Sequence, residues 1–216
     1  MKFLPTLHIF TLSILAALSF MQQSTANAAE TVNIFNGSLN GWKEKSFVDH
    51  TDYTINADGK INAQCNASAS SMYREIAIDL DKTPVLNWSW KLPSPGKYNS
   101  VNERTKTGDD FAARIYAVVD TGTIIPNVLT LNYVWAGGEE NGAHWNNPFY
   151  KKAHMVVVND ADQTGQWVSQ SRNIKDDFQN YFARDIDTID GIAIMTDCDN
   201  TGGQAAAFYG RIYMSP

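Results

Sequence analysis

Short apolar or alternating runs, separated by turn-forming residues, recur along most of the chain and constrain its fold more than any other feature. The run from Leu86 to Trp90, for example, alternates apolar and polar residues, which places successive side chains on opposite faces of a strand. Pairs such as Asn36-Gly37 and Asp58-Gly59 supply turns between the runs. The pattern predicts an all-β protein, a jelly-roll-like β-sandwich of about 10 strands. The predicted strands cover residues 31–35, 61–65, 72–79, 85–91, 111–119, 130–136, 153–158, 167–173, 191–196 and 206–214.

One segment departs from the strand pattern. Between Ile174 and Ile186, the aromatic residues Phe178, Tyr181 and Phe182 recur at helical spacing. We expect one short helix near 174–186 that covers an end or an edge of the sandwich.

The N-terminal residues resemble an export signal. Lys2 precedes an apolar run from Ile9 to Met21, and the small-residue site Ala26-Asn27-Ala28 follows, as in a secretory signal peptide cleaved after Ala28. The run is too short for a membrane-spanning helix, which takes about 20 residues, although an uncleaved anchor is the alternative. Residues 1–28 are therefore interpreted as a signal peptide and 29–216 as a single periplasmic or secreted domain with no further membrane insertion.

Two cysteines, Cys65 and Cys198, follow the predicted cleavage site. In an exported protein an even number of cysteines favours a disulfide. The alternative is two separately buried thiols that pack as small hydrophobic groups. The spacing of these cysteines and the histidines gives no zinc signature.

The charge of the chain excludes one class of partner. The formal net charge is −6, and the basic residues are scattered, with the densest groups at Arg104–Lys106 and Lys151-Lys152. Nucleic-acid-binding proteins carry a clustered basic patch. We therefore expect no nucleic-acid partner.

Alternation along four of the predicted strands also predicts a polar sheet face. If these strands are neighbours, the side chains opposite the core belong to Asn87, Ser89, Arg114, Tyr116, Asn132 and Asp197. The same reasoning places Phe111 in the core. Amides, an aromatic ring and an arginine near a carboxylate suit sugar hydroxyls. The alternative is an ordinary solvated face with a surface ion pair, which contributes little to stability.

Five ordered groups of residues carry a resemblance to a known family. They are Met72–Ile76 with Leu86–Lys91, Glu103–Phe111 with Ala113–Tyr116, Leu131–Ala136, Ile192–Asp197 with Asp199–Gly202, and Tyr209-Gly210. This set resembles the bacterial DUF3047 family over nearly all of the chain after residue 28. The resemblance implies an exported jelly-roll sandwich similar to carbohydrate-binding modules, and it implies no particular activity. The family pattern has threonine at the position of Cys198, which argues against a catalytic role for this cysteine and fits a bridge to Cys65.

Two acidic turns follow the first half of a calcium loop. Asp197, Asp199 and Gly202 place oxygen ligands at alternate positions before a glycine, and the segment 160–165 repeats the arrangement. Neither loop has the glutamate expected at the twelfth position, which excludes EF-hands. Calcium at Asp197 and Asp199 is one interpretation, and a turn held by its own Asp and Asn side chains is the other. For residues 160–165 the second interpretation is favoured.

Charged residues before the predicted 111–119 strand form another candidate site. Glu103, Arg104, Asp109 and Asp110 could supply an acid or base with an electrostatic partner, or Arg104 could anchor the loop to a carboxylate. A glycine-rich loop farther on carries His144 and Trp145, which could form a sugar platform. The motifs of common hydrolases and nucleotide-binding proteins do not occur in the sequence.

Three functions fit these observations. The preferred one is a non-catalytic module that binds carbohydrate or another polar ligand. The alternatives are a glycan-active enzyme with two acids from Glu103, Asp109, Asp110 and Asp197, and a structural or assembly protein of the envelope. The predicted ligand-binding residues are Asn87, Arg104, Asp109, Asp110, Arg114, Tyr116, Asn132, Trp145, Asp197, Asp199 and Asn200.

Overall fold

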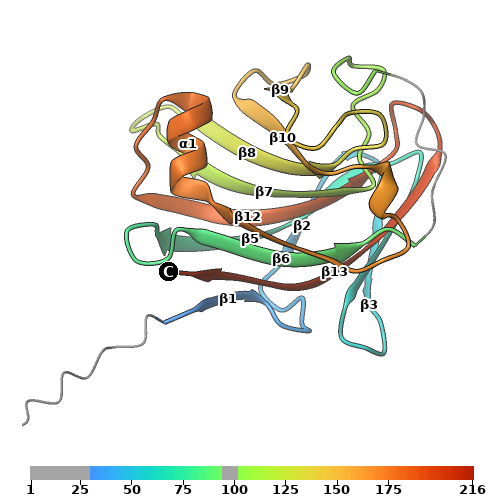
Figure 1. Cartoon of the computed structure of the whole chain (residues 1–216), viewed down its shortest axis with the longest axis horizontal. Coiled ribbons are helices and arrows are strands. Elements are labelled where there is room, and N and C mark those ends of the chain that lie inside the picture. The colour runs from blue at the N-terminus through green and yellow to red at the C-terminus, as the bar shows by residue number, and fades with distance from the viewer. Residues whose placement is uncertain (1–29, 94–101) are drawn as a thin grey trace, which may run out of the picture.

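The computed structural model describes residues 30–93 and 102–216. The predicted signal peptide, residues 1–28, lies outside the described residues. Within them, thirteen strands form two sheets, and one α-helix lies across an end of the sandwich beside β8 (Figure 1). Among the residues that the structure describes, no helix is long and apolar enough to cross a membrane.

The six-stranded sheet has the order β11-β6-β13-β4-β3, and β1 pairs with β13 on the side of this path. Its strands are β1 (Val32–Phe35), β3 (Asp52–Ile55), β4 (Ile61–Asn66), β6 (Val85–Lys91), β11 (Val168–Asn173) and β13 (Gln204–Ser215). All of its pairings are antiparallel.

The seven-stranded sheet has the order β2-β5-β12-β7-β8-β10-β9. Its strands are β2 (Lys43–Val48), β5 (Ala69–Asp79), β7 (Ala113–Asp120), β8 (Val128–Trp135), β9 (His144–Asn146), β10 (Ala153–Asn159) and β12 (Thr188–Asp197). The pair β8 and β10 is parallel, whereas the other pairs in this sheet are antiparallel.

The predicted sandwich is confirmed, but the strand number was too low. The three missing strands are β2, β3 and β9, and each lies at the end of a sheet order. An edge strand is paired on one side only, and its side chains need not alternate between core and solvent. All six residues of β2 are exposed, so its sequence carries no burial pattern that could reveal it.

Aromatic side chains from both sheets form the centre of the core. The ring of Trp88 stacks on Tyr133 with centroids 5.3 Å apart, and Trp90 packs against Trp135 at 5.8 Å. The indole N–H of Trp90 donates to Asn159 Oδ1 at 2.7 Å, which satisfies a polar group inside the core. Because β6 supplies one ring of each pair and β8 the other, these contacts hold the two sheets together.

The helix α1 (Ile174–Phe182) is shorter than predicted because Ala183 adopts the left-handed conformation and ends it. Asn173 caps its N-terminus by accepting hydrogen bonds from the backbone N–H groups of Lys175 and Asp176. The carboxylate of Asp177 fixes the helix to the sheets, since it accepts from the hydroxyl of Tyr133 and from both Nε and Nη2 of Arg172. A 3-10 turn, η1 (Ala161–Gln163), is capped by Asp160, which agrees with the turn interpretation of this segment.

Candidate functional site

Two neighbouring strands of the seven-stranded sheet bring an arginine and an aspartate together on its outer face. Arg114 of β7 and Asp197 at the end of β12 form an ion pair, with Nη2 2.9 Å from Oδ2. Both side chains are more than nine-tenths buried. The predicted proximity of these two residues is therefore correct, but they do not form an open face.

The loop before β7 and the loop after β12 meet at this ion pair. The backbone N–H of Phe111 donates to Asp197 Oδ1 at 3.1 Å. The carboxylate of Asp110 accepts from the backbone N–H groups of Asn200 and Thr201, and so joins the loop before β7 to the loop after β12. We call the four carboxylates gathered here, Asp109, Asp110, Asp197 and Asp199, the acidic cluster.

The environment of the acidic cluster favours protonation of its members. Burial raises the pKa of Asp197 well above its usual range; Arg114 opposes the shift, and the nearby charges of Asp109 and Asp110 contribute to it. Burial likewise raises the pKa of Asp109, against the effects of Arg114 and of the amide of Asn147, which donates to Asp109 Oδ2 at 2.7 Å. The pKa of Asp199 is also raised, mainly by burial and then by the charge of Asp110. The electrostatic cost of several carboxylates in one partly desolvated space is thus only partly offset by Arg114.

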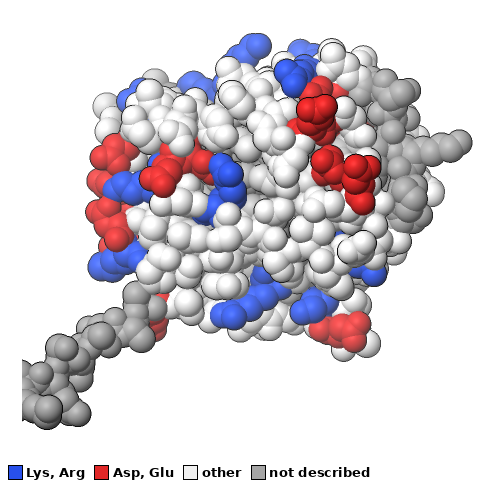
Figure 2. All heavy atoms as spheres, in the orientation of Figure 1, with Lys and Arg blue, Asp and Glu red and all other residues white. Residues whose placement is uncertain are grey.

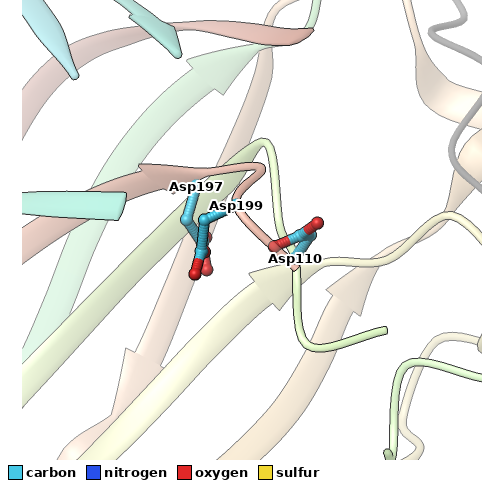
Figure 3. A group of neighbouring side chains, drawn as sticks. All are labelled: Asp110, Asp197 and Asp199. Atoms are coloured by element: carbon cyan, nitrogen blue, oxygen red, sulfur yellow. The ribbon is translucent and has the colours of Figure 1, made fainter. Parts of the chain in front are cut away.

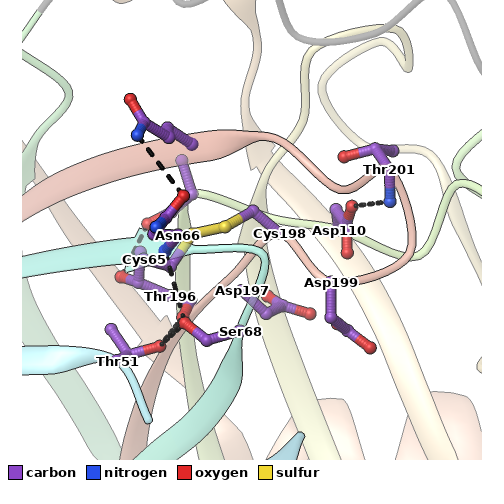
Figure 4. Close-up of a disulfide and its surroundings, with 12 residues drawn as sticks. Thr51, Cys65, Asn66, Ser68, Asp110, Thr196, Asp197, Cys198, Asp199 and Thr201 are labelled. Carbon is purple, nitrogen blue, oxygen red and sulfur yellow. Dashed lines mark hydrogen bonds between the residues drawn. A yellow bond between two sulfur atoms is a disulfide. The ribbon is translucent and has the colours of Figure 1, made fainter. Parts of the chain in front are cut away.

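A disulfide lies beside the acidic cluster. Cys65 of β4 is bonded to Cys198, which follows Asp197 directly, with 6.2 Å between their Cα atoms (Figure 4). The predicted disulfide is confirmed. It connects the six-stranded sheet to the end of the seven-stranded one and so fixes where the Asp197 loop begins.

The outer face of the six-stranded sheet carries a different kind of site, an open hollow of about 400 Å³. It is lined by Asn87, Trp88, Ser89, Ser169, Gln170, Ser171, Arg211 and Tyr213, and we call it the serine groove. Ser169 lies opposite Ser89, and Ser171 lies opposite Asn87, in the register of β11 and β6. Because the serine side chains on these two adjacent strands are short, they leave a depression in the surface of the sheet.

Trp167 stands next to the floor of the serine groove. A Cβ atom on Gly210 would lie 2.1 Å from Ser89 Oγ and 3.3 Å from Cζ3 of Trp167, so both side chains approach the bare glycine backbone. The Trp167 side chain is 45% exposed, which is unusual for so large an apolar group. Its ring lies 6.5 Å from Phe208. An aromatic surface is therefore available to a ligand beside the serine hydroxyls.

Tyr213 and Arg211 border the serine groove on the β13 side. The guanidinium of Arg211 lies 4.2 Å from the ring centroid of Tyr213 and donates to Asn33 Oδ1 at 2.8 Å. Asn87 is also held in place, because its amide donates to Ser215 Oγ and its Oδ1 accepts from Ser171 Oγ at 2.9 Å. The polar side chains of the groove are thus oriented before any ligand arrives.

The structure separates Asn87 from the other predicted ligand-binding residues. The expectation that its strand neighbours those of Arg114 and Asp197 is wrong, since β6 belongs to the six-stranded sheet and β7 and β12 to the seven-stranded one. Alternation assigned Asn87 to the outer face correctly. It could not assign the sheet.

Tyr116 and Asn132 do lie side by side on the outer face of the seven-stranded sheet. Tyr116 is partly buried, and Asn132 is buried with its amide donating to Thr130 of its own strand. Asn200 contributes to the acidic cluster by donating to Asp110 and Asp199. None of these three residues borders the serine groove as the structure describes it.

The other predicted site residues on the loops bond to neighbouring loops and so hold them in place. Arg104 pairs with Glu139 at 2.6 Å and lies over the ring of Trp145 at 5.2 Å, which agrees with the loop-anchoring alternative. Glu103 is buried and accepts from the backbone N–H groups of Gly137 and Gly138. Phe111 does not enter the main core as predicted. It packs with Trp145 in a smaller cluster, because β7 begins only at Ala113.

His144 does not form a sugar platform with Trp145, because the two residues point to opposite faces of β9. His144 Nδ1 lies 3.2 Å from His154 Nε2, and both rings pack against Tyr181 of α1. Burial, together with the charge of His144, lowers the pKa of His154 to about 4. These residues contribute to packing between α1 and the sheet.

Sequence reasoning missed most of the serine groove. Ser169, Ser171, Arg211, Tyr213 and Trp167 were not proposed as site residues. Alternation along β11 and β13 places several of them opposite the core. What was not available from the sequence is the adjacency of β11, β6 and β13.

The charged side chains do not form a continuous area of one sign on the face shown in Figure 2. Lys and Arg side chains lie in small groups there, with Asp and Glu groups between them, and much of the middle of this face is uncharged. This surface offers mainly neutral side chains to a partner.

The fold and these sites define the class: a two-sheet β-sandwich with an open polar groove on one sheet and a partly buried carboxylate cluster on the other. Residues 40–213 match the family described as "Protein of unknown function (DUF3047)", and the chain belongs to this family. The resemblance found in the sequence is confirmed. No curated protein matches the chain.

Several solved structures are similar. The family 11 carbohydrate-binding module from Clostridium thermocellum, in complex with a β-1,3-1,4-mixed-linked tetrasaccharide, is 12% identical, with 87% of this chain and 96% of that one covered and a TM-score of 0.44. The family 11 carbohydrate-binding module of the cellulosomal cellulase Lic26A-Cel5E of the same organism is 11% identical, with 86% of this chain and 93% of that one covered and a TM-score of 0.46. The xyloglucanase domain of NopAA from Sinorhizobium fredii, in complex with cellobiose, is 11% identical, with 83% of this chain and 96% of that one covered and a TM-score of 0.45.

Proposed function

We propose that this protein is an exported, non-catalytic binding module that holds a neutral carbohydrate in the serine groove. The observation that carries the proposal is the combination of hydroxyl and amide side chains in one open hollow with the exposed ring of Trp167 beside it.

The chemistry of the groove suits a sugar ring. The side chains of Ser89, Ser169 and Asn87 offer hydrogen-bond donors and acceptors to sugar hydroxyl groups. The guanidinium of Arg211 adds further N–H donors, since it stays protonated. The exposed ring of Trp167 suits the apolar C–H face of a pyranose. Hydrogen bonds to Ser171 and Ser215 already hold the Asn87 side chain, so less conformational entropy is lost there when a sugar binds.

The side chains of the groove support binding rather than hydrolysis. Glycosidases generally use two carboxyl groups on either side of the scissile bond, and no Asp or Glu is among the described residues that line the groove. Of the four acids proposed for an enzyme, Glu103, Asp109 and Asp197 are about 95% buried or more, and all four, with Asp110, belong to the loop before β7 or to the end of β12, in the other sheet. The groove and those acids therefore do not form one catalytic cleft.

Export is supported by the disulfide between Cys65 and Cys198, since such bonds persist mainly in oxidising compartments. The signal-like sequence of residues 1–28 supports the same location. The periplasm and the extracellular medium both meet this requirement.

A glycan array tests the proposal. We expect the purified protein to retain a subset of neutral glycans, and Trp167→Ala to weaken that retention about tenfold or more, the equivalent of about 1.4 kcal/mol. Titration calorimetry with the best glycan on the array gives the affinity ratio.

Phe149→Ala is the matched control, since Phe149 is an exposed aromatic residue that does not line the groove. We expect this variant to bind as the wild type does. The proposal fails if the folded wild type retains no glycan, or if Trp167→Ala and Phe149→Ala bind equally well.

A further inference from the structure

Three carboxylates of the acidic cluster have the spacing of ligands to one ion. One oxygen atom from each of Asp110, Asp197 and Asp199 lies within 4.8 Å of the others. In Figure 3 the side chains of Asp197 and Asp199 point the same way from the end of β12, with Asp110 approaching from the neighbouring loop. Calcium binds oxygen at about 2.3 to 2.6 Å, so two of its ligands lie at most about 5 Å apart. The three oxygens therefore fit around one centre.

A fourth carboxylate supplies an independent observation. Asp109 is 5% exposed, and its Oδ1 atom is buried without a hydrogen-bond partner among the described residues. Its other oxygen is positioned by the amide of Asn147. Asp109 directly precedes Asp110, and the Asn200 amide that donates to Asp110 and Asp199 lies 3.5 Å from the backbone oxygen of Asp109, so this residue lies beside the same carboxylates. A buried carboxylate oxygen without a partner is costly unless something binds it.

The charges in this space are unbalanced. Four carboxylates converge, and Arg114 forms an ion pair with one of them, Asp197. Since carboxylates in one desolvated space repel each other strongly, the ionised cluster requires more positive charge than one guanidinium provides. A divalent cation would reduce the repulsion and bind the unpartnered oxygen at once.

We propose that Asp109, Asp110, Asp197 and Asp199 bind one divalent cation of the calcium type. The ion joins the loop before β7 to the loop after β12, beside the disulfide. Oxygen ligands only, drawn from two loops rather than from a rigid octahedral frame, favour calcium over magnesium. Asn147 and Asn200 orient ligand carboxylates through their amide groups. The site is separate from the serine groove.

Calcium binding is measured on the full folded protein after treatment with a chelator and its removal. We expect titration calorimetry with CaCl2 to show one saturable site, and thermal unfolding to shift to higher temperature with CaCl2. Potassium chloride at matched ionic strength should not reproduce the shift.

Two variants locate the ion. Asp199→Asn changes a partly exposed ligand and should keep the fold, as checked by circular dichroism, while it weakens calcium binding about tenfold or more. Asp58→Asn, an exposed aspartate in a distant turn, should leave binding unchanged. The proposal is overturned if the folded wild type shows no saturable calcium binding, or if Asp199→Asn binds calcium as tightly as Asp58→Asn does. Loss of glycan binding alone would not affect it, because that result concerns the groove.

Discussion

The serine groove and the acidic cluster both occupy the outer face of a sheet, but they differ in what lies above them. The groove on β6, β11 and β13 is open, and its largest aromatic neighbour is 45% exposed. The acidic cluster is covered by the loop before β7 and the loop after β12, which bond to each other through Asp110. An outward-facing polar side chain is therefore available to a ligand only where no loop folds back over its strand.

The same residue types have opposite consequences in the two places. Arg211 is exposed and stacks on Tyr213, so water solvates and screens its charge. Arg114 is buried, and its charge must be balanced by Asp197. Substitutions in the covered region should therefore change stability, while substitutions in the open region should change binding.

Removal of the disulfide should have the largest effect. For the double variant Cys65→Ala/Cys198→Ala, a sequence separation of 133 residues and the chain-entropy relation predict a loss of about 5 kcal/mol in the free energy of unfolding. Urea unfolding followed by tryptophan fluorescence measures the change.

Because the disulfide lies at the acidic cluster and not at the groove, the folded fraction of this variant should still bind the groove ligand. A loss below about 1 kcal/mol would show that the bond does not constrain the unfolded chain as the relation assumes.

Breaking the buried ion pair should come next. Arg114→Leu leaves Asp197 without its partner in a desolvated site and should cost about 3 to 5 kcal/mol. The measurement is urea unfolding in the presence of a chelator, so that a bound cation does not contribute.

Arg104→Leu is the control, because Arg104 forms an ion pair of similar length with Glu139 but its side chain is 46% exposed, against 8% for Arg114. Its effect should be much smaller, since solvent screens such pairs. Equal losses for the two variants would mean that burial is not what distinguishes the two regions.

Filling the floor of the groove should have the smallest effect on stability. In Gly210→Ala, the new methyl group meets Ser89 Oγ and the edge of Trp167, so these side chains must move, at a cost of about 1 kcal/mol. Glycan affinity, measured by titration calorimetry, should fall more than stability does, because the groove changes shape.

Gly203→Ala tests the same change beside the acidic cluster, where the nearest atom to the new group is Thr201 Oγ1 at an ordinary 3.6 Å. It should leave the glycan affinity as it is. If both variants lower the affinity alike, the ligand does not depend on the shape of the groove.

The sequence predicted the interior of the sandwich well because burial on a strand leaves a local, two-residue period. Leu86, Trp88 and Trp90 were assigned to the core and are buried there. The edge strand β2 was missed because its residues are all exposed and carry no such period. Phe111 was assigned to the core from the same period, but the strand begins after it.

For the candidate sites, local information was sufficient for some residues only. The acidic residues around Asp197 and the pairing of Cys65 with Cys198 were predicted from neighbours in the sequence and from the number of cysteines. The grouping of Asp109 and Asp110 with them depends on β7 and β12 being adjacent, although the paired residues of the two strands are more than 70 positions apart in the sequence. The groove depends in the same way on the adjacency of β6, β11 and β13.

The sequence by itself determined that the chain is an all-β sandwich of the DUF3047 family, which side of most inner strands faces the core, and that Cys65 and Cys198 could be joined. Each of these follows from local periodicity, from residue types or from ordered motifs. Only the tertiary structure decided that Asn87 belongs to an open groove and Arg114 to a covered cluster. Strand order and loop position depend on contacts between segments far apart in the chain, and no local pattern records them.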